Sequence, residues 1–204
     1  MNEKRESMEK YLRSTEIVDW THPAVSRSAG SIAAQSNDKM EITKRCFEWV
    51  RDRIKHSHDY QLSPVTCSAS EVIAAGTGYC FAKSHLLVAL LRANGIPARF
   101  CYQRLSRDDN GPPFVLHGLV AAHIPRYGWY RIDPRGNRAD IDAQFTPPIE
   151  RLAFHVRLPE EADLPEIRTD PLPVVVDALR SYDTWDALWE NLPDIELLQT
   201  VEST

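Results

Sequence analysis

The stretch that decides the fold is "GTGYCFAKSHLLVALLRANGIPAR", residues 76–99. From Tyr79 to Ala93 its apolar residues recur at three- and four-residue steps, which predicts a helix with a buried face. An Asn-Gly pair then ends the helix, and a proline two residues later prevents it from resuming. Cys80 is the exception, because it lies at the helix start behind two glycines, where a structural cysteine has little to pack against. We therefore ask what a thiol does there.

Two more helices are predicted upstream. Apolar residues recur with helical spacing over about 37–57, which is typical of a long amphipathic helix. Ser68 and Glu71 have the spacing of a capping box, so a short helix is expected from Ser70 to Ala75.

Downstream, the periodicity changes to that of strands. "ARFCYQRL", "FVLHGLVAAHI" and "GWYRIDPRG" are rich in β-forming residues and are separated by turn sequences. Such an order favours consecutive hairpins. The predicted fold class is α+β, with N-terminal helices packed on an antiparallel β-sheet.

The rest of the chain is predicted to flank this core. Residues 1–36 form an N-terminal extension, 37–145 the core, and 146–204 a proline-rich C-terminal extension, both extensions packed on the core. Two short helices are expected in the last part, near Leu172–Ser181 and Thr184–Asn191. That part either stabilises the core without touching the site or forms a lid or wall over it.

Composition excludes several classes of protein. A chain of 204 residues with 43% hydrophobic and 26% charged residues is typical of one globular unit. The net charge of −5 predicts no basic surface for nucleic acid or anionic lipid. With no apolar signal-peptide core and no long apolar segment, a cytoplasmic location is the default expectation. The four cysteines form no C-x-x-C pair, which argues against structural zinc.

Cys80 has the position of a nucleophile. A cysteine reacts as a thiolate, and the N–H groups at a helix N-terminus favour negative charge. The N–H of Cys80 itself can hold the oxyanion of a tetrahedral intermediate. Such a cysteine needs an imidazole, and the imidazole needs a carboxylate that fixes its tautomer.

His117 and Asp133 are the best candidates for these partners. His117 lies within a predicted strand, and Asp133 ends the next one. The turn at "PRYG" makes the two strands antiparallel neighbours, so both side chains can point toward the helix of Cys80. His123 shares the nominal face of His117 and is the alternative base.

These residues carry a resemblance. A "G-x-C" that opens a helix ending in "GIPAR", then an isolated histidine, then "W-x-x-x-D", resembles the transglutaminase-like superfamily over about 37–144. The resemblance implies a papain-type fold with Cys80 as nucleophile, His117 as general base and acid, and Asp133 as the residue that orients His117. Members often have an aromatic residue soon after the histidine, whereas "HGLV" stands here.

We further expect five residues to bind substrate: Gly78, Tyr79, Gly118, Trp129 and His58. The glycines leave space beside the sulfur, Trp129 is expected at the cleft edge, and His58 is a candidate for holding the oxyanion. The "HSHD" run at 56–59 looks like part of a metal site, but no second group of ligands is spaced to complete it.

The resemblance implies acyl transfer from a peptide or small amide through a thioester on Cys80, with no metal or organic cofactor. We expect hydrolysis, as in a cysteine protease or amidase, rather than cross-linking by a transglutaminase-type acyltransferase. The rival interpretation is a catalytically inactive binding or scaffold module on the same fold. Rapid alkylation of Cys80 by iodoacetamide would favour the enzyme.

Overall fold

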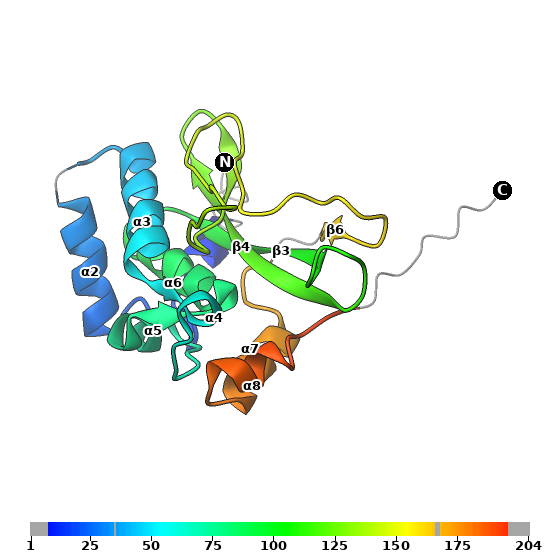
Figure 1. Ribbon diagram of the computed structural model, residues 1–204. Coiled ribbons are helices and arrows are strands. Elements are labelled where there is room, and N and C mark those ends of the chain that lie inside the picture. Colours follow the sequence, from blue (N-terminus) through cyan, green and yellow to red (C-terminus); the bar gives the residue numbers. More distant parts are fainter. Residues whose placement is uncertain (1–7, 35, 166–167, 196–204) are drawn as a thin grey trace.

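The computed structural model describes residues 8–34, 36–165 and 168–195, so the outermost parts of both predicted extensions lie outside the described residues. Helices gather on one side of an antiparallel sheet (Figure 1). The helices are η1 Lys10–Leu12, α2 Pro23–Ala33, α3 Lys39–Arg53, α4 Ser57–Tyr60, α5 Ala69–Ala75, α6 Cys80–Ala93, α7 Pro173–Ser181 and α8 Trp185–Trp189. The strands are β1 Lys55–His56, β2 Thr77–Gly78, β3 Ala98–Ser106, β4 Phe114–Ile124, β5 Gly128–Ile132 and β6 Ala162–Asp163.

Helix α6 lies at the centre of the molecule. It packs against α2, α3 and α5 and against strands β3 and β4. Every residue from Cys80 to Arg92 is buried, so the prediction of a single buried face is too narrow. A helix enclosed on all sides is apolar nearly all round, and this is what the "LLVALL" run provides.

The sheet has the order β5-β4-β3-β6, with antiparallel neighbours throughout. Tyr102 pairs with Gly118 between β3 and β4, and Val120 pairs with Ile132 between β4 and β5. These hairpins confirm the predicted meander and the α+β class. The fourth strand was not predicted, because β6 comes from the C-terminal extension and has only two residues.

Gly118 fixes how closely α6 approaches the sheet. A Cβ atom at this position would lie 2.9 Å from Phe81 Cδ1 and 3.3 Å from Phe81 Cα. Only glycine permits this distance. The adjacent Ser84 hydroxyl donates to the Gly118 carbonyl across the same contact, at 3.1 Å.

The capping box predicted for α5 is confirmed. Ser68 Oγ accepts from the Glu71 N–H, and the Glu71 carboxylate accepts from the Ser68 N–H. Helix α2 was not predicted; it begins at a proline after His22, whose side chain caps the Ala24 N–H. The N-terminal segment thus adds a helix to the layer around α6.

The last described residues of the C-terminal extension are tied to the core by hydrogen bonds and an ion pair. Tyr79 donates a hydrogen bond from its hydroxyl to the carbonyl of Trp185, and the Leu116 N–H donates to Pro193 O at 2.8 Å. Arg104 forms a two-bond ion pair with Asp194, at 2.7 and 2.8 Å. Among the described residues, no helix has the length and apolar character needed to cross a membrane.

Candidate active site

Three elements bring the predicted triad together. Cys80 is the first residue of α6, and His117 lies in β4, next to the Gly118 contact with Phe81. Asp133 was predicted to end the strand after His117. In the structure β5 ends at Ile132, and Asp133 directly follows it. All three side chains are buried, with exposures of 7%, 5% and 0%.

Asp133 holds His117 through a short hydrogen bond. His117 Nε2–H donates to Asp133 Oδ2 at 2.7 Å. The same carboxylate accepts from the Arg135 N–H and the Ala153 N–H, each at 3.1 Å. Burial alone would raise the pKa of Asp133, but the charge of His117 and these hydrogen bonds hold it below its ordinary value. The carboxylate is therefore ionised and fixed in place.

His117 links the carboxylate to the sulfur. With Nε2 engaged by Asp133, Nδ1 is the ring nitrogen left to interact with Cys80. Burial lowers the pKa of His117, whereas the charges of Asp133 and Cys80 and the two hydrogen bonds raise it to about 10. The imidazole is thus protonated at neutral pH.

The other three cysteines have a different environment. Burial raises the pKa of Cys46 to about 12 and the pKa values of Cys67 and Cys101 to about 11. Cys46 lies within the core. Cys80 differs in its place at a helix N-terminus that no side chain caps, where the first N–H groups have no helical partner.

A cavity of about 350 Å³ opens onto the triad. Its walls contain Cys80 and His117, and residues from four other parts of the chain. They are His56, His58 and Tyr79 before Cys80, residues 105–109 and 115–116 around the β3–β4 turn, Arg135, Arg138, Asp140 and Ile141 after Asp133, and Ala153, Phe154, His155, Arg157, Glu161, Trp189 and Leu192 from the C-terminal extension. A volume near 350 Å³ is at the lower end for small-molecule sites.

Comparison with known proteins identifies this arrangement. The family model described as the Transglutaminase-like superfamily matches residues 26–134, which is more than half of the chain and includes all three triad residues. The chain belongs to the transglutaminase-like superfamily. The match begins at residue 26, within the predicted N-terminal extension, and ends before the C-terminal one. No curated protein matches the chain.

One solved structure agrees with this fold, and a second aligns with a lower TM-score. A "Putative Cysteine Protease" from Cytophaga hutchinsonii aligns with a TM-score of 0.50 and 22% identity over 63% of this chain and 42% of that chain. The periplasmic domain of TgpA from Pseudomonas aeruginosa aligns with a TM-score of 0.47 and 18% identity over 64% of this chain and 47% of that chain. The chain spans less than half the length of either protein. Its fold is the transglutaminase-like, papain-type α+β fold.

Two of the five residues predicted to bind substrate line the cavity of this transglutaminase-like chain. Tyr79 lies at the N-cap of α6, and His58 stacks on Trp189 with ring centroids 3.8 Å apart. The stack joins α4 to the C-terminal extension. The two aromatic rings therefore form one wall of the cavity.

The other three predicted residues do not line the cavity. The space beside Gly118 is filled by Phe81, and a Cβ atom at Gly78 would lie 3.1 Å from Ala82. Both glycines serve close packing of α6, so the substrate space predicted beside them is wrong. Trp129 packs in a separate cluster with Leu119 and Ala121. The predicted position at the cleft edge is not observed.

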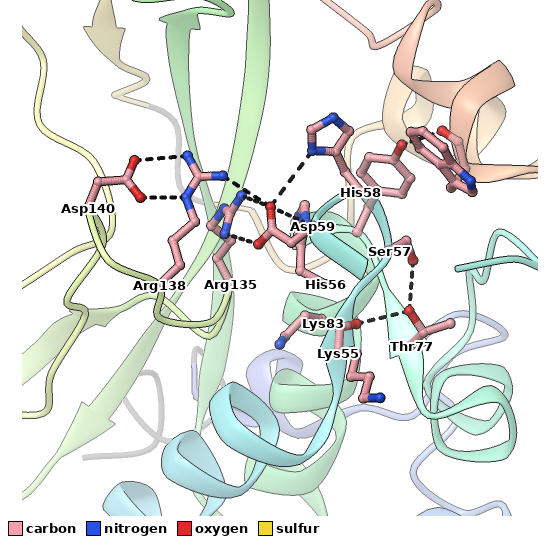
Figure 2. Close-up of polar contacts among 12 residues, drawn as sticks. Lys55, His56, Ser57, His58, Asp59, Thr77, Lys83, Arg135, Arg138 and Asp140 are labelled. Atoms are coloured by element: carbon pink, nitrogen blue, oxygen red, sulfur yellow. Dashed lines mark hydrogen bonds and ion pairs between the residues drawn. The ribbon is translucent and has the colours of Figure 1, made fainter. Parts of the chain in front are cut away.

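An ion-pair network that the sequence did not reveal lies next to the triad (Figure 2). Arg135 donates to both oxygens of Asp59, at 2.6 and 2.8 Å, and Arg138 reaches the same carboxylate at 3.2 Å. Arg135 also supplies the N–H that binds Asp133. The network therefore fixes the loop after Asp133 to α4.

Lys83 links α6 to the end of α3. Its buried ammonium donates to the carbonyls of Arg51 and Ile54 at the end of α3. Burial, followed by the charge of Arg135, lowers the pKa of Lys83 to about 7. No sequence pattern distinguishes this lysine from an exposed one.

The structure also bears on two alternatives from the sequence: His123 as the base, and the "HSHD" run as part of a metal site. His123 is exposed, lies edge-on to Trp129 and does not line the cavity. Within the described ranges, no group of three or more His, Cys, Asp or Glu side chains is placed to hold a metal ion. In the "HSHD" run, Asp59 instead binds arginines.

Proposed function

We propose that this chain is a cysteine enzyme that transfers the acyl group of an amide to Cys80, and that water then takes the acyl group. The observation that carries the proposal is the placement of Cys80 and His117 together at the wall of a cavity, with His117 hydrogen-bonded to Asp133. A protonated imidazole beside a cysteine favours the thiolate form. The connected triad supports an enzyme over a binding module.

The proposed reaction has two halves. The Cys80 thiolate attacks the amide carbon, and the carbonyl electron pair moves onto oxygen, close to the N–H groups that open α6. The pair returns as the C–N bond breaks, and His117 gives its proton to the departing amine. A water molecule then loses a proton to His117 and attacks the thioester, which releases the acid and restores the thiolate.

The size of the cavity supports water as the acceptor. A space of about 350 Å³ holds a small amide or a short piece of peptide. A lysine side chain from a second protein would have to share this space with the acyl group, whereas water needs little room. We extend the proposal to a small amide or short peptide as substrate, without nucleic acid, membrane or cofactor, and keep the cytoplasm as the expected location.

A panel of short peptides tests this function. The peptides carry a side-chain amide, a C-terminal amide or an internal peptide bond, and glycinamide is present as a competing amine. Mass spectrometry should find acid products with the wild-type protein and none with Cys80→Ser. Mainly glycinamide conjugates would show a cross-linking preference, and turnover that survives Cys80→Ser would contradict the thiol mechanism.

A further inference from the structure

His56 lies beside the nucleophile although the triad does not use it. Strand β1 runs parallel to β2, and His56 pairs with Gly78, two residues before Cys80. The imidazole also lies edge-on to Tyr79, with ring centroids 5.5 Å apart. Main-chain pairing and ring packing thus hold His56 next to the start of α6.

The two ring nitrogens of His56 have different surroundings. The residue is 7% exposed and lines the cavity together with Cys80. Nδ1 is buried and has no hydrogen-bond partner. The nearest carboxylate oxygen, Asp59 Oδ1, is 3.7 Å away and already accepts from Arg135 and Arg138. Nε2 is therefore the polar atom that can meet a ligand in the cavity.

The charge state of His56 suits a hydrogen-bond donor. Burial and then the positive charge of Arg135 lower the pKa of His56 well below its ordinary value. A neutral imidazole carries one proton, and the tautomer depends on the partners of the two nitrogens. Because no partner fixes the proton on Nδ1, an oxygen bound at Nε2 can select the Nε2–H form.

We propose that His56 Nε2–H donates a hydrogen bond to the carbonyl oxygen of the acyl group that Cys80 attacks. This inference rests on the proposed acyl transfer. As the thiolate attacks, the carbonyl electron pair moves onto this oxygen, and His56 and the Cys80 N–H stabilise the negative charge together. The pair then returns and expels the leaving group, so His56 neither gains nor loses a proton.

Two reagents separate this role from a structural one. p-Nitrophenyl acetate acylates Cys80 through a tetrahedral intermediate with an oxyanion, whereas iodoacetamide alkylates the sulfur by direct displacement, without one. His56→Phe keeps a ring but removes the donor, and His56→Gln supplies a neutral donor of similar reach. His123→Phe is the matched control, since His123 is exposed and outside the cavity.

The expected result is selective. His56→Phe should lower the rate of acylation by about 10²-fold, which is typical for loss of one oxyanion donor. The rate of alkylation should stay unchanged, and His56→Gln should recover much of the acylation. His123→Phe should change neither rate. If His56→Phe does not fold, His56→Asn replaces it, because its shorter amide should also lose acylation and leave alkylation intact.

Three outcomes would overturn the inference: unchanged acylation in His56→Phe or His56→Asn, equal loss of acylation and alkylation, or no recovery in a folded His56→Gln. A different result would show that the proposed function itself is wrong. In that case wild-type Cys80 is inert toward both reagents, before any change at His56.

Discussion

At the scale of single residues, the proposed chemistry depends on one proton-binding group, the imidazole of His117. His117 is buried between an ionised carboxylate and the sulfur of Cys80, and its pKa is raised to about 10. Asp133 is fixed by two main-chain N–H groups as well as by His117. The imidazole is thus oriented from one side and free to exchange its proton on the other.

His117→Ala should reduce kcat/KM more than Asp133→Asn does. The first change removes both thiolate formation and protonation of the leaving amine, whereas the second mainly misorients the ring. By comparison with other triads we expect a loss of at least about 10⁴-fold for His117→Ala and a loss roughly tenfold smaller for Asp133→Asn. Steady-state kinetics on the same amide check this order, and a larger effect of His123→Ala would contradict the assignment of the base.

The stability of the protein should fall between about pH 6.5 and pH 10 through His117. The pKa of this group is raised from an ordinary value near 6.5 to about 10 in the folded state. Its stabilisation is complete below the unfolded pKa and is lost as the pH rises through the folded one. Lys83, with its pKa lowered to about 7, acts in the opposite direction.

The difference between wild type and His117→Gln isolates this contribution. Urea unfolding at several pH values should show the gap in the free energy of unfolding narrowing from pH 6.5 toward pH 10. A gap that is constant across this window would mean that His117 is not protonated in the folded state.

At the scale of elements, the contact between α6 and β4 sets the geometry of the site. Cys80 opens α6, His117 lies in β4, and Gly118 lets the two elements approach so closely that Phe81 packs against the strand. A change in this contact should move the sulfur relative to the imidazole.

Gly118→Ala tests the contact. The added Cβ would meet the Phe81 ring at 2.9 Å and its backbone at 3.3 Å. We expect a loss of stability of about 1–3 kcal/mol, as for other overpacked sites, and slower alkylation of Cys80. Gly30→Ala is the control, because nothing lies within 4 Å of a Cβ there and alanine favours the helix. Equal effects of the two changes would contradict the role of Gly118.

Sequence reasoning predicted the helices and strands better than it predicted which residues lie next to one another in the fold. The capping box at Ser68, the apolar spacing before Asn94 and the turns between strands are local signals, and each predicted its element. His56 was missed because β1 and β2 are two-residue strands without a periodicity. Trp129 was misplaced because strand alternation assigns a face but does not reveal what packs on it.

At the scale of the whole molecule, the C-terminal extension is part of the site. Ala153 donates to Asp133, and Trp189 and Leu192 line the cavity. Its short strand β6 also covers the edge of β3. Its prolines interrupt every long periodic run, so the sequence left open whether this segment stabilises the core or forms a wall. Its described residues contact the core and line part of the cavity.

Truncation after Gln144 should lower the melting temperature and change the reactivity of Cys80. The truncated chain loses the Ala153 hydrogen bond and one wall of the cavity, and it exposes the edge of β3. Trp189→Ala in the full chain opens the wall alone, and it should speed the reaction of Cys80 with a bulky maleimide more than with iodoacetamide. If truncation changed neither the melting temperature nor the reactivity of Cys80, the C-terminal extension would neither stabilise the core nor form a wall of the site.

The most direct test of the central claim is the rate at which iodoacetamide labels each cysteine of the folded protein at neutral pH. The triad predicts that Cys80 reacts at least about tenfold faster than Cys46, Cys67 and Cys101, whose thiol pKa values are raised by burial. It also predicts that His117→Ala removes this advantage. Equal labelling of all four cysteines, or a Cys80 rate that does not depend on His117, would contradict a Cys80–His117–Asp133 catalytic centre.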